Sequence, residues 1–158
     1  MTKSTRRELI DAVRKRLVPA HERLGFSLVP LNDQEKRSEV GAAFPFGRLR
    51  RSTETGFDLV EIQFNKDGSA SFRLNIAQVP AAGIEHAVGR VAAEDVWVHY
   101  LDHFCTLYAR RFLRRWFHVE DGARQDQIDA TVDRVVDLLP QVDEYLRYGR
   151  RGGNLRCV

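Results

Sequence analysis

The sequence predicts a single α+β domain, in which an antiparallel sheet of three to five strands packs against an N-terminal helix and C-terminal helices on one face. Three observations predict this architecture: a hairpin pattern in the middle of the chain and an amphipathic helical pattern near each end. A chain of 158 residues suits one domain. We expect that domain over residues 1–149, followed by a flexible basic tail over residues 150–158.

The hairpin lies within Gly56–Val79, and Asp67-Gly68 supplies its turn chemistry. A three-residue loop at Lys66–Gly68 predicts that Ile62 faces Phe72 and that Glu61 faces Arg73. Apolar side chains then share one face of the two strands, because successive residues of a strand point to opposite faces. This expected core face consists of Val60, Ile62, Phe64, Ala70, Phe72, Leu74 and Ile76. Apolar residues on the opposite face, at the end away from the turn, predict a second cover there.

The N-terminal helix is predicted by a capping box formed by Thr5 and Glu8, and Gly25 is expected to end it. Pro19 should kink this helix. A short strand is expected within Phe26–Leu31 and another at Leu49–Thr53, with a long loop between them over residues 32–48. The apolar stripe of the helix consists of Ile10, Val13, Leu17, Ala20 and Leu24.

The second half of the chain predicts a helix from about Glu94 or Asp95, whose end the pattern does not fix. Residues 112–119 could continue this helix or return as a strand, and we favour a strand at Arg115–Val119 because of its aromatic and β-branched residues. A long C-terminal helix follows. Asp126 is the expected N-cap of the last helix, Gly149 its stop, and Pro140 should bend or split it. Its apolar stripe consists of Ile128, Val132, Val135, Leu139, Val142 and Leu146.

Composition bounds the class of protein. Hydrophobic residues make up 43% and charged residues 30%, which is ordinary for a globular domain. No stretch approaches the roughly 18 consecutive apolar residues of a membrane span, and the N-terminus lacks an apolar signal segment, so we expect a cytoplasmic protein without a membrane partner. Cys105 and Cys157 are too few for a disulfide framework, and we expect reduced thiols.

The net charge of +3 and the abundance of arginine have two explanations. They are compatible with phosphate binding, and they are also what a GC-rich genome produces without such a role. Basic residues dominate residues 3–24 and acidic residues dominate residues 120–144, which favours pairing between two helices of opposite charge. We therefore do not expect nucleic acid as the partner.

Four segments resemble members of the domain of unknown function 4304 family, a family of uncharacterised bacterial proteins. They are Leu24-Gly25-Phe26, Val60-Glu61-Ile62-Gln63-Phe64, Phe72-Arg73-Leu74-Asn75-Ile76 and Trp116-Phe117 before an acidic C-terminal helix. The resemblance implies an α+β domain whose role is open, and it carries over no catalytic residue. By analogy alone, small α+β proteins of this kind act as partners or immunity factors.

One candidate site lies on the polar face of the hairpin, where Glu61, Gln63, Arg73 and Asn75 gather. Such donors and acceptors suit the floor of a ligand site, and a solvated cross-strand Glu61–Arg73 pair explains them as well. A deep pocket above these side chains would favour the ligand site, whereas a convex exposed face would favour the solvated pair.

Asp95, His99 and His103 are spaced to share one face of the predicted helix, and His99 and His103 have the spacing of a chelating pair. No third ligand is evident, although His86 and His118 are candidates, and helix capping by Asp95 is the simpler explanation. We expect no cofactor.

A basic-and-aromatic cluster is the third candidate site. It consists of Arg110, Arg111, Arg114 and Arg115 among Phe112, Leu113, Trp116 and Phe117. This mixture is typical of a groove for single-stranded nucleic acid, and it equally fits an ordinary element whose other face is solvated by arginine.

No catalytic signature is complete, so we expect a non-catalytic binding or interaction domain, with a protein as the expected partner. The alternatives are an enzyme or metal-binding protein that uses the Asp95, His99 and His103 face, and a weak nucleic-acid binder that uses the arginines of residues 110–116. The oligomeric state is not predictable. An enzyme should show a concave site with convergent titratable groups, whereas an interaction domain should show a flat exposed patch.

Overall fold

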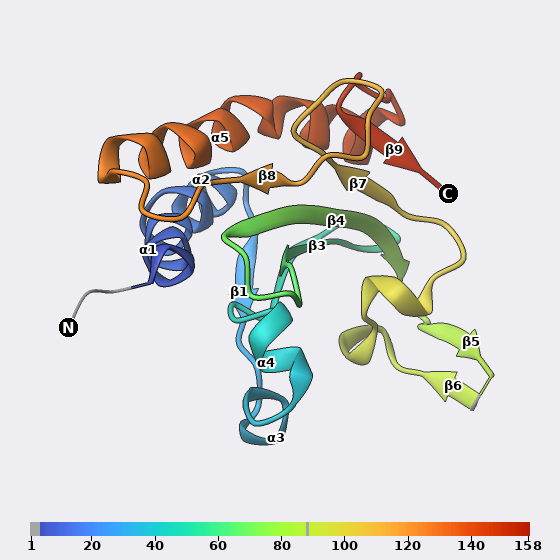
Figure 1. The fold of residues 1–158 in the computed structure, drawn as a ribbon. Helices are drawn as coiled ribbons and strands as arrows, with labels where there is room; N and C mark the ends of the chain where they lie inside the picture. The colour runs from blue at the N-terminus through green and yellow to red at the C-terminus, as the bar shows by residue number, and fades with distance from the viewer. Residues whose placement is uncertain (1–3, 88) are drawn as a thin grey trace.

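The computed structural model describes residues 4–87 and 89–158, and it confirms an α+β fold built on an antiparallel sheet (Figure 1). Neighbouring strands follow the order β1-β2-β3-β4-β7-β9, and β8 pairs with β4 beside β7. The described residues give this sheet seven strands rather than the expected three to five, because three short edge strands extend it. The strands are β1 (Ser27–Val29), β2 (Arg48–Ser52), β3 (Gly56–Phe64), β4 (Ser71–Pro80), β7 (Cys105–Leu107), β8 (Phe117–His118) and β9 (Leu155–Cys157).

The β3–β4 hairpin has the predicted faces, but its predicted pairs are wrong by two residues. Ile62 faces Leu74 rather than Phe72, and Glu61 faces Asn75 rather than Arg73. The loop is longer than three residues because side chains stabilise it: the Asn65 Oδ1 atom accepts from the Asp67 amide at 3.2 Å, and the Asp67 carboxylate accepts from the Ser69 amide at 2.8 Å. A shift of two residues leaves every side chain on its own face.

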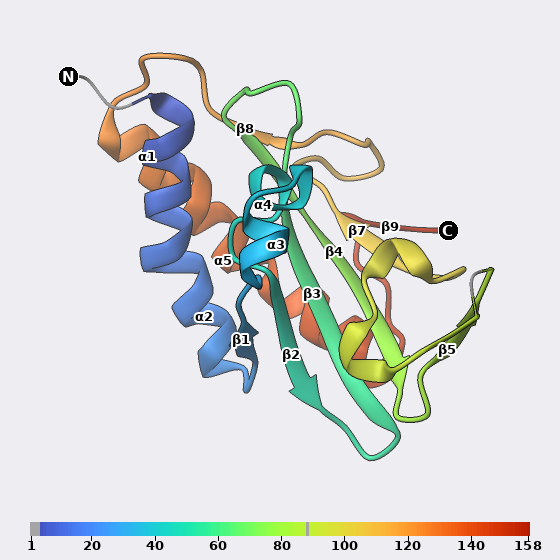
Figure 2. The same ribbon diagram turned by 90° about the horizontal axis from the view of Figure 1, so that it is seen from below.

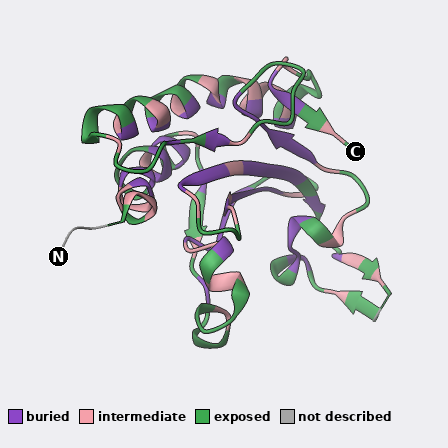
Figure 3. Cartoon of the chain, viewed as in Figure 1, coloured by how far each residue is buried: buried purple, intermediate pink, exposed green. Residues whose placement is uncertain are grey.

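The first face of the sheet is covered by α1 (Thr5–Ala12), the π-helical turn η1 (Val13–Leu17), α2 (Val18–Arg23) and α5 (Gln125–Tyr148). Buried side chains of these elements pack on the apolar face of the hairpin in one core. Figure 3 shows the buried side of α5 turned toward the sheet and its outer side exposed. Helix α1 begins after Ser4, whose side chain accepts from the Arg7 amide. Thr5 therefore does not form the predicted capping box, and its hydroxyl accepts from the Gly122 amide. Pro19 lies in the first turn of α2, directly after η1.

Ion pairs join the basic N-terminal helical segment to the acidic helix α5, as predicted. The Arg16 guanidinium lies 2.9 Å from Asp133 and 3.1 Å from Asp129 on α5. Arg124 rather than Asp126 is the N-cap of α5, and Gly149 ends the helix in the left-handed conformation with φ of 71°. The helix continues through Pro140, so the predicted split does not occur.

A smaller core covers the far end of the second face, as the sequence predicts. Leu59, Ala77 and Val79 pack there against Val96 and Val98. Figure 2 views the molecule from this side, with α4 and the 93–100 segment in front of the sheet and α5 behind it. The expected loop over residues 32–48 contains two short helices, α3 (Asp33–Lys36) and α4 (Glu39–Ala43), because Asn32 and Ser38 cap them.

The helix predicted from about Glu94 or Asp95 is wrong. The chain forms two single 3₁₀ turns, η2 (Ala93–Asp95) and η3 (Val98–Tyr100), and then the strand β7. The apolar residues of this segment belong to two different cores. Val96 and Val98 pack in the smaller core, whereas Cys105 and Leu107 pack in the larger one. Upstream, β5 (Ile84–His86) and β6 (Gly89–Val91) form a separate two-stranded hairpin.

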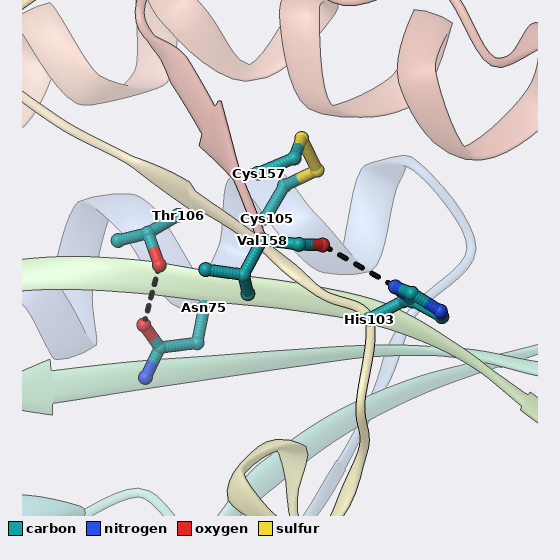
Figure 4. Close-up of a disulfide and its surroundings, with 6 residues drawn as sticks. All are labelled: Asn75, His103, Cys105, Thr106, Cys157 and Val158. Carbon is teal, nitrogen blue, oxygen red and sulfur yellow. Dashed lines mark hydrogen bonds between the residues drawn. A yellow bond between two sulfur atoms is a disulfide. The ribbon is translucent and has the colours of Figure 1, made fainter.

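The C-terminal segment is not the flexible tail that we predicted, and the cysteines are not reduced. Residues Leu155–Cys157 pair with β7 as an edge strand, and Leu155 is buried. Cys105 and Cys157 face each other across these two strands and form a disulfide bond, which Figure 4 shows. The pairing of the last residues with an internal strand depends on the whole sheet, which explains why no local pattern predicts it.

Candidate functional site

The polar face of the hairpin forms the floor of a cavity of about 380 Å³. Glu61, Gln63, Arg73 and Asn75, the four residues that the sequence places together, all line it. The walls come from elements distant in the sequence: Val40, Ala43 and Phe44 at α4, Val98 and His99 at η3, and Phe104 before β7. Glu39 and Lys66 also line it and are exposed. The site is therefore concave, with a polar floor and largely apolar walls.

Glu61 is a buried acid on this floor, only 1% exposed. Its Oε2 atom accepts a hydrogen bond from the Val98 amide at 2.7 Å. Burial raises the pKa of Glu61 to about 7, although the bonds from Val98 and Asn75 and the charge of Arg48 favour the ionised form. Arg48, the buried neighbour of Glu61 on β2, donates instead to the Val96 carbonyl and lies 4.5 Å from the centre of the Trp97 ring. Glu61 can thus hold or release a proton near neutral pH.

A chain of hydrogen bonds fixes the rest of the floor. The Thr106 hydroxyl donates to the Asn75 Oδ1 atom at 3.1 Å, as Figure 4 shows. The Asn75 Nδ2 atom donates to the Gln63 Oε1 atom at 2.9 Å, and the Arg73 Nε atom donates to the same oxygen at 3.1 Å. Because each side chain is held by the next, the floor is preorganised before any ligand binds.

Arg73 is a cation without an opposing charge. Its guanidinium donates to the Tyr108 hydroxyl at 3.0 Å and lies 4.4 Å from the centre of the Trp116 ring. No carboxylate of the described residues forms an ion pair with it. The expected Glu61–Arg73 pair is wrong, because the two-residue shift in register sets Arg73 opposite Gln63. The charge of Arg73 is therefore available to a ligand.

The predicted metal face is not assembled, because the helix on which it depends is absent. His99 lies on η3 and lines the cavity, whereas the ring of His103 lies 3.4 Å from the carbonyl oxygen of Val158. Desolvation lowers the pKa of His99, with smaller contributions from His86 and Lys66. Within residues 4–87 and 89–158, no group of three or more His, Cys, Asp or Glu side chains is placed to hold a metal ion.

Three of the four arginines of the basic-and-aromatic cluster lie in a tight loop over residues 110–114, and Arg115 follows it. None of the four lines the first cavity. The Ala109 amide donates to the Arg115 carbonyl at 2.6 Å and closes this loop, and Arg110 forms a bridge to Leu113. All four arginines are exposed. Arg111 and Arg114 line a second cavity, whereas Arg110 and Arg115 line a third.

Sequence reasoning missed the walls of the first cavity. Phe44 lies in a segment that the sequence predicts only as a loop, and His99 was weighed only as one of a chelating pair on a helix, so neither residue is placed over the hairpin by its sequence pattern. The main-chain amide of Val98, which binds Glu61, leaves no trace in a side-chain pattern. The one available signal was Glu61 itself, a charged residue between the apolar Val60 and Ile62 on a central strand.

Comparisons with known proteins found no match: no family model, curated protein or solved structure is similar to this chain. The resemblance to the domain of unknown function 4304 family stays a prediction. Among the described residues, no helix is long and apolar enough to cross a membrane.

Proposed function

We propose that this protein is a binding domain for a small organic acid with an apolar body. The observation that carries the proposal is the concave cavity above the hairpin, with apolar walls and one unpaired guanidinium, that of Arg73. Small-molecule sites combine apolar walls with a few convergent polar groups in this way. A protein partner bound through a flat patch is less well supported, because the predicted site residues lie in a hollow.

In this proposal each part of the site has a role. Arg73 binds the carboxylate of the ligand, because a guanidinium offers paired donors in a plane that matches it. The apolar body packs between Phe44 and Phe104, two walls of the cavity. Glu61, in its neutral form, donates a hydrogen bond to a second polar atom of the ligand.

The test is binding of phenylacetate and isovalerate, each compared with its neutral amide, by calorimetry and protein NMR. We expect the acids to perturb the signals of Glu61 and Asn75 and to bind about tenfold more tightly than the amides, a difference of about 1.4 kcal/mol. Arg73→Gln should remove this preference, and Arg73→Lys should restore part of it. Arg23→Gln, an exposed arginine of α2 outside the cavity, is the matched control. Equal binding of acid and amide, or perturbation confined to other surfaces, contradicts the proposal.

A second candidate function is proton transfer by Glu61, and its pKa of about 7 favours it. If the cavity is catalytic, an acid that binds there should be chemically changed on prolonged incubation, as followed by mass spectrometry. Glu61→Gln should then keep binding and stop conversion. Recovery of the unchanged acid from the natural protein, at full occupancy of the cavity, eliminates this candidate for that ligand.

We propose a cytoplasmic location as well, on the composition of the chain. The Cys105–Cys157 disulfide argues against this proposal, because such bonds persist mainly in oxidising compartments. Alkylation of free thiols in intact cells, followed by mass spectrometry, distinguishes the two cases: labelled cysteines support the cytoplasm, and a protected pair supports an oxidising compartment.

A further inference from the structure

A second cavity, of about 490 Å³, gathers positive charge from two distant segments of the chain. Arg111 and Arg114 come from the loop over residues 110–114, and Arg151 and Arg156 come from the C-terminal segment. No acidic residue lines this cavity, and no described carboxylate forms an ion pair with any of these four arginines. Nearby Arg150, by contrast, pairs with Glu144 at 3.3 Å. The hollow therefore carries an excess of positive charge that an anion would neutralise.

The two segments are held together by a buried anchor, so this charge cluster is built into the fold. Asn154 is buried, and its side chain donates to the Tyr108 carbonyl at 3.0 Å while its main-chain carbonyl accepts from the Tyr108 amide at 2.9 Å. Gln141 of α5 bonds both the amide and the side chain of Asn154. The Phe112 amide donates to the Gly153 carbonyl at 3.1 Å. Gly153 also allows close approach, because a Cβ atom there would overlap the Arg111 guanidinium.

An aromatic ring stands at the edge of the cluster. Phe112 is 65% exposed and has φ of 63°, a left-handed conformation that is rare for a bulky side chain. The Arg111 guanidinium lies 5.4 Å from the centre of its ring. An exposed aromatic face beside arginines is the arrangement that stacks nucleic-acid bases while the guanidinium groups bind phosphate.

We infer that this cavity binds a ligand that carries several phosphate groups and a base, with the phosphates on the four arginines and the base stacked on Phe112. Two sources share this chemistry: a free nucleoside polyphosphate and the backbone of single-stranded nucleic acid. The proposal is independent of the organic-acid site, which lies over the β3–β4 hairpin and shares no lining residue with this cavity.

The experiment uses the full chain with its disulfide intact. Fluorescence anisotropy measures binding of a labelled oligothymidylate of about 12 nucleotides, and calorimetry measures binding of ATP and of inorganic tripolyphosphate. In the double variant Arg111→Ala/Arg114→Ala we expect at least about tenfold weaker binding, and the dependence of log K on log salt should flatten by about 0.7 for each arginine in contact with single-stranded phosphate. Arg23→Ala should bind as the natural protein does.

Phe112→Ala separates stacking from charge. This variant should bind ATP and the oligonucleotide about tenfold more weakly and bind tripolyphosphate as the natural protein does, since only the first two probes carry a base. Tight binding of the oligonucleotide with weak binding of ATP identifies single-stranded nucleic acid as the source, and the reverse identifies a free nucleotide. Three results overturn the inference: no binding of any probe at about 50 mM salt, equal loss in Arg23→Ala, or binding of poly-glutamate as tight as that of the oligonucleotide, which would indicate an acidic protein partner.

Discussion

At about pH 8 the Glu61→Gln variant is expected to be more stable than the natural protein, with a free energy of unfolding about 3 kcal/mol higher. Burial raises the pKa of Glu61 from 4.5 to about 7 in the folded state. Between these values the folded chain binds more protons than the unfolded chain, so the contribution of Glu61 to stability falls as pH rises through this window. Gln is neutral at every pH and avoids this cost.

His21 has the opposite effect over almost the same range of pH. It is fully buried, and desolvation lowers its pKa from 6.5 to about 4, outweighing its hydrogen bond to the Leu17 carbonyl. The unfolded chain therefore binds more protons between these values, and stability falls by about 3 kcal/mol as pH decreases through them. In the natural protein the two slopes offset each other between pH 4.5 and 6.5.

Urea unfolding of three variants across this range of pH separates the two groups. Glu61→Gln should reveal the loss of stability in acid that His21 causes, and His21→Leu should reveal a loss toward neutral pH that Glu61 causes. Glu39→Gln, an exposed glutamate that lines the same cavity, is the matched control and should follow the natural protein. Parallel curves for Glu61→Gln and the natural protein would show that water solvates this carboxylate.

Replacing Arg51 by Met is expected to lower the free energy of unfolding by about 3–5 kcal/mol, because the change leaves a buried carboxylate without its partner. The side chains of Arg51 and Asp58 are 10% and 3% exposed, and the two groups lie 2.9 Å apart. Arg51 also reaches Asp143 of α5 at 2.7 Å and thereby joins the sheet to the helix. Met preserves the length of the stem beside Phe26, so the loss reports mainly on charge.

Urea unfolding at neutral pH measures this loss, and two further variants interpret it. Arg90→Met removes an exposed ion pair with Glu85 and should change stability little. The double variant Arg51→Met/Asp58→Leu should recover most of the loss, because no buried charge is then left alone. A loss below about 1 kcal/mol in Arg51→Met would mean that solvent, or the Gln78 side chain that donates to the Asp58 carboxylate at 3.3 Å, compensates Asp58.

The faces of the hairpin could be predicted because side chains alternate along a strand, and a wrong face would expose Val60, Ile62 and Phe64 to water. The register could not, since a shift of two residues preserves every face and the loop is stabilised by Asn65 and Asp67 rather than by Gly68 alone. For the same reason the four floor residues of the site were correctly grouped while the Glu61–Arg73 pair was wrong.

Contacts between distant segments account for what the sequence did not reveal. The apolar and aromatic residues from Trp97 to Tyr108 recur at spacings that fit a helix, yet Val98 and Leu107 serve separate cores on opposite faces of the sheet. The second arginine cavity combines loop 110–114 with residues near the C-terminus. Local periodicity carries no information about which segments meet in this way.

Glu61 is a buried acid on the floor of a preorganised cavity, and both proposed roles of this cavity use it. An NMR titration of its side-chain carboxyl carbon, with and without saturating phenylacetate, tests this directly. We predict a midpoint of about 7 for the free protein and a higher midpoint with the acid bound, because a second negative charge nearby disfavours ionisation. A midpoint near the ordinary value of 4.5 that phenylacetate leaves unchanged would contradict it.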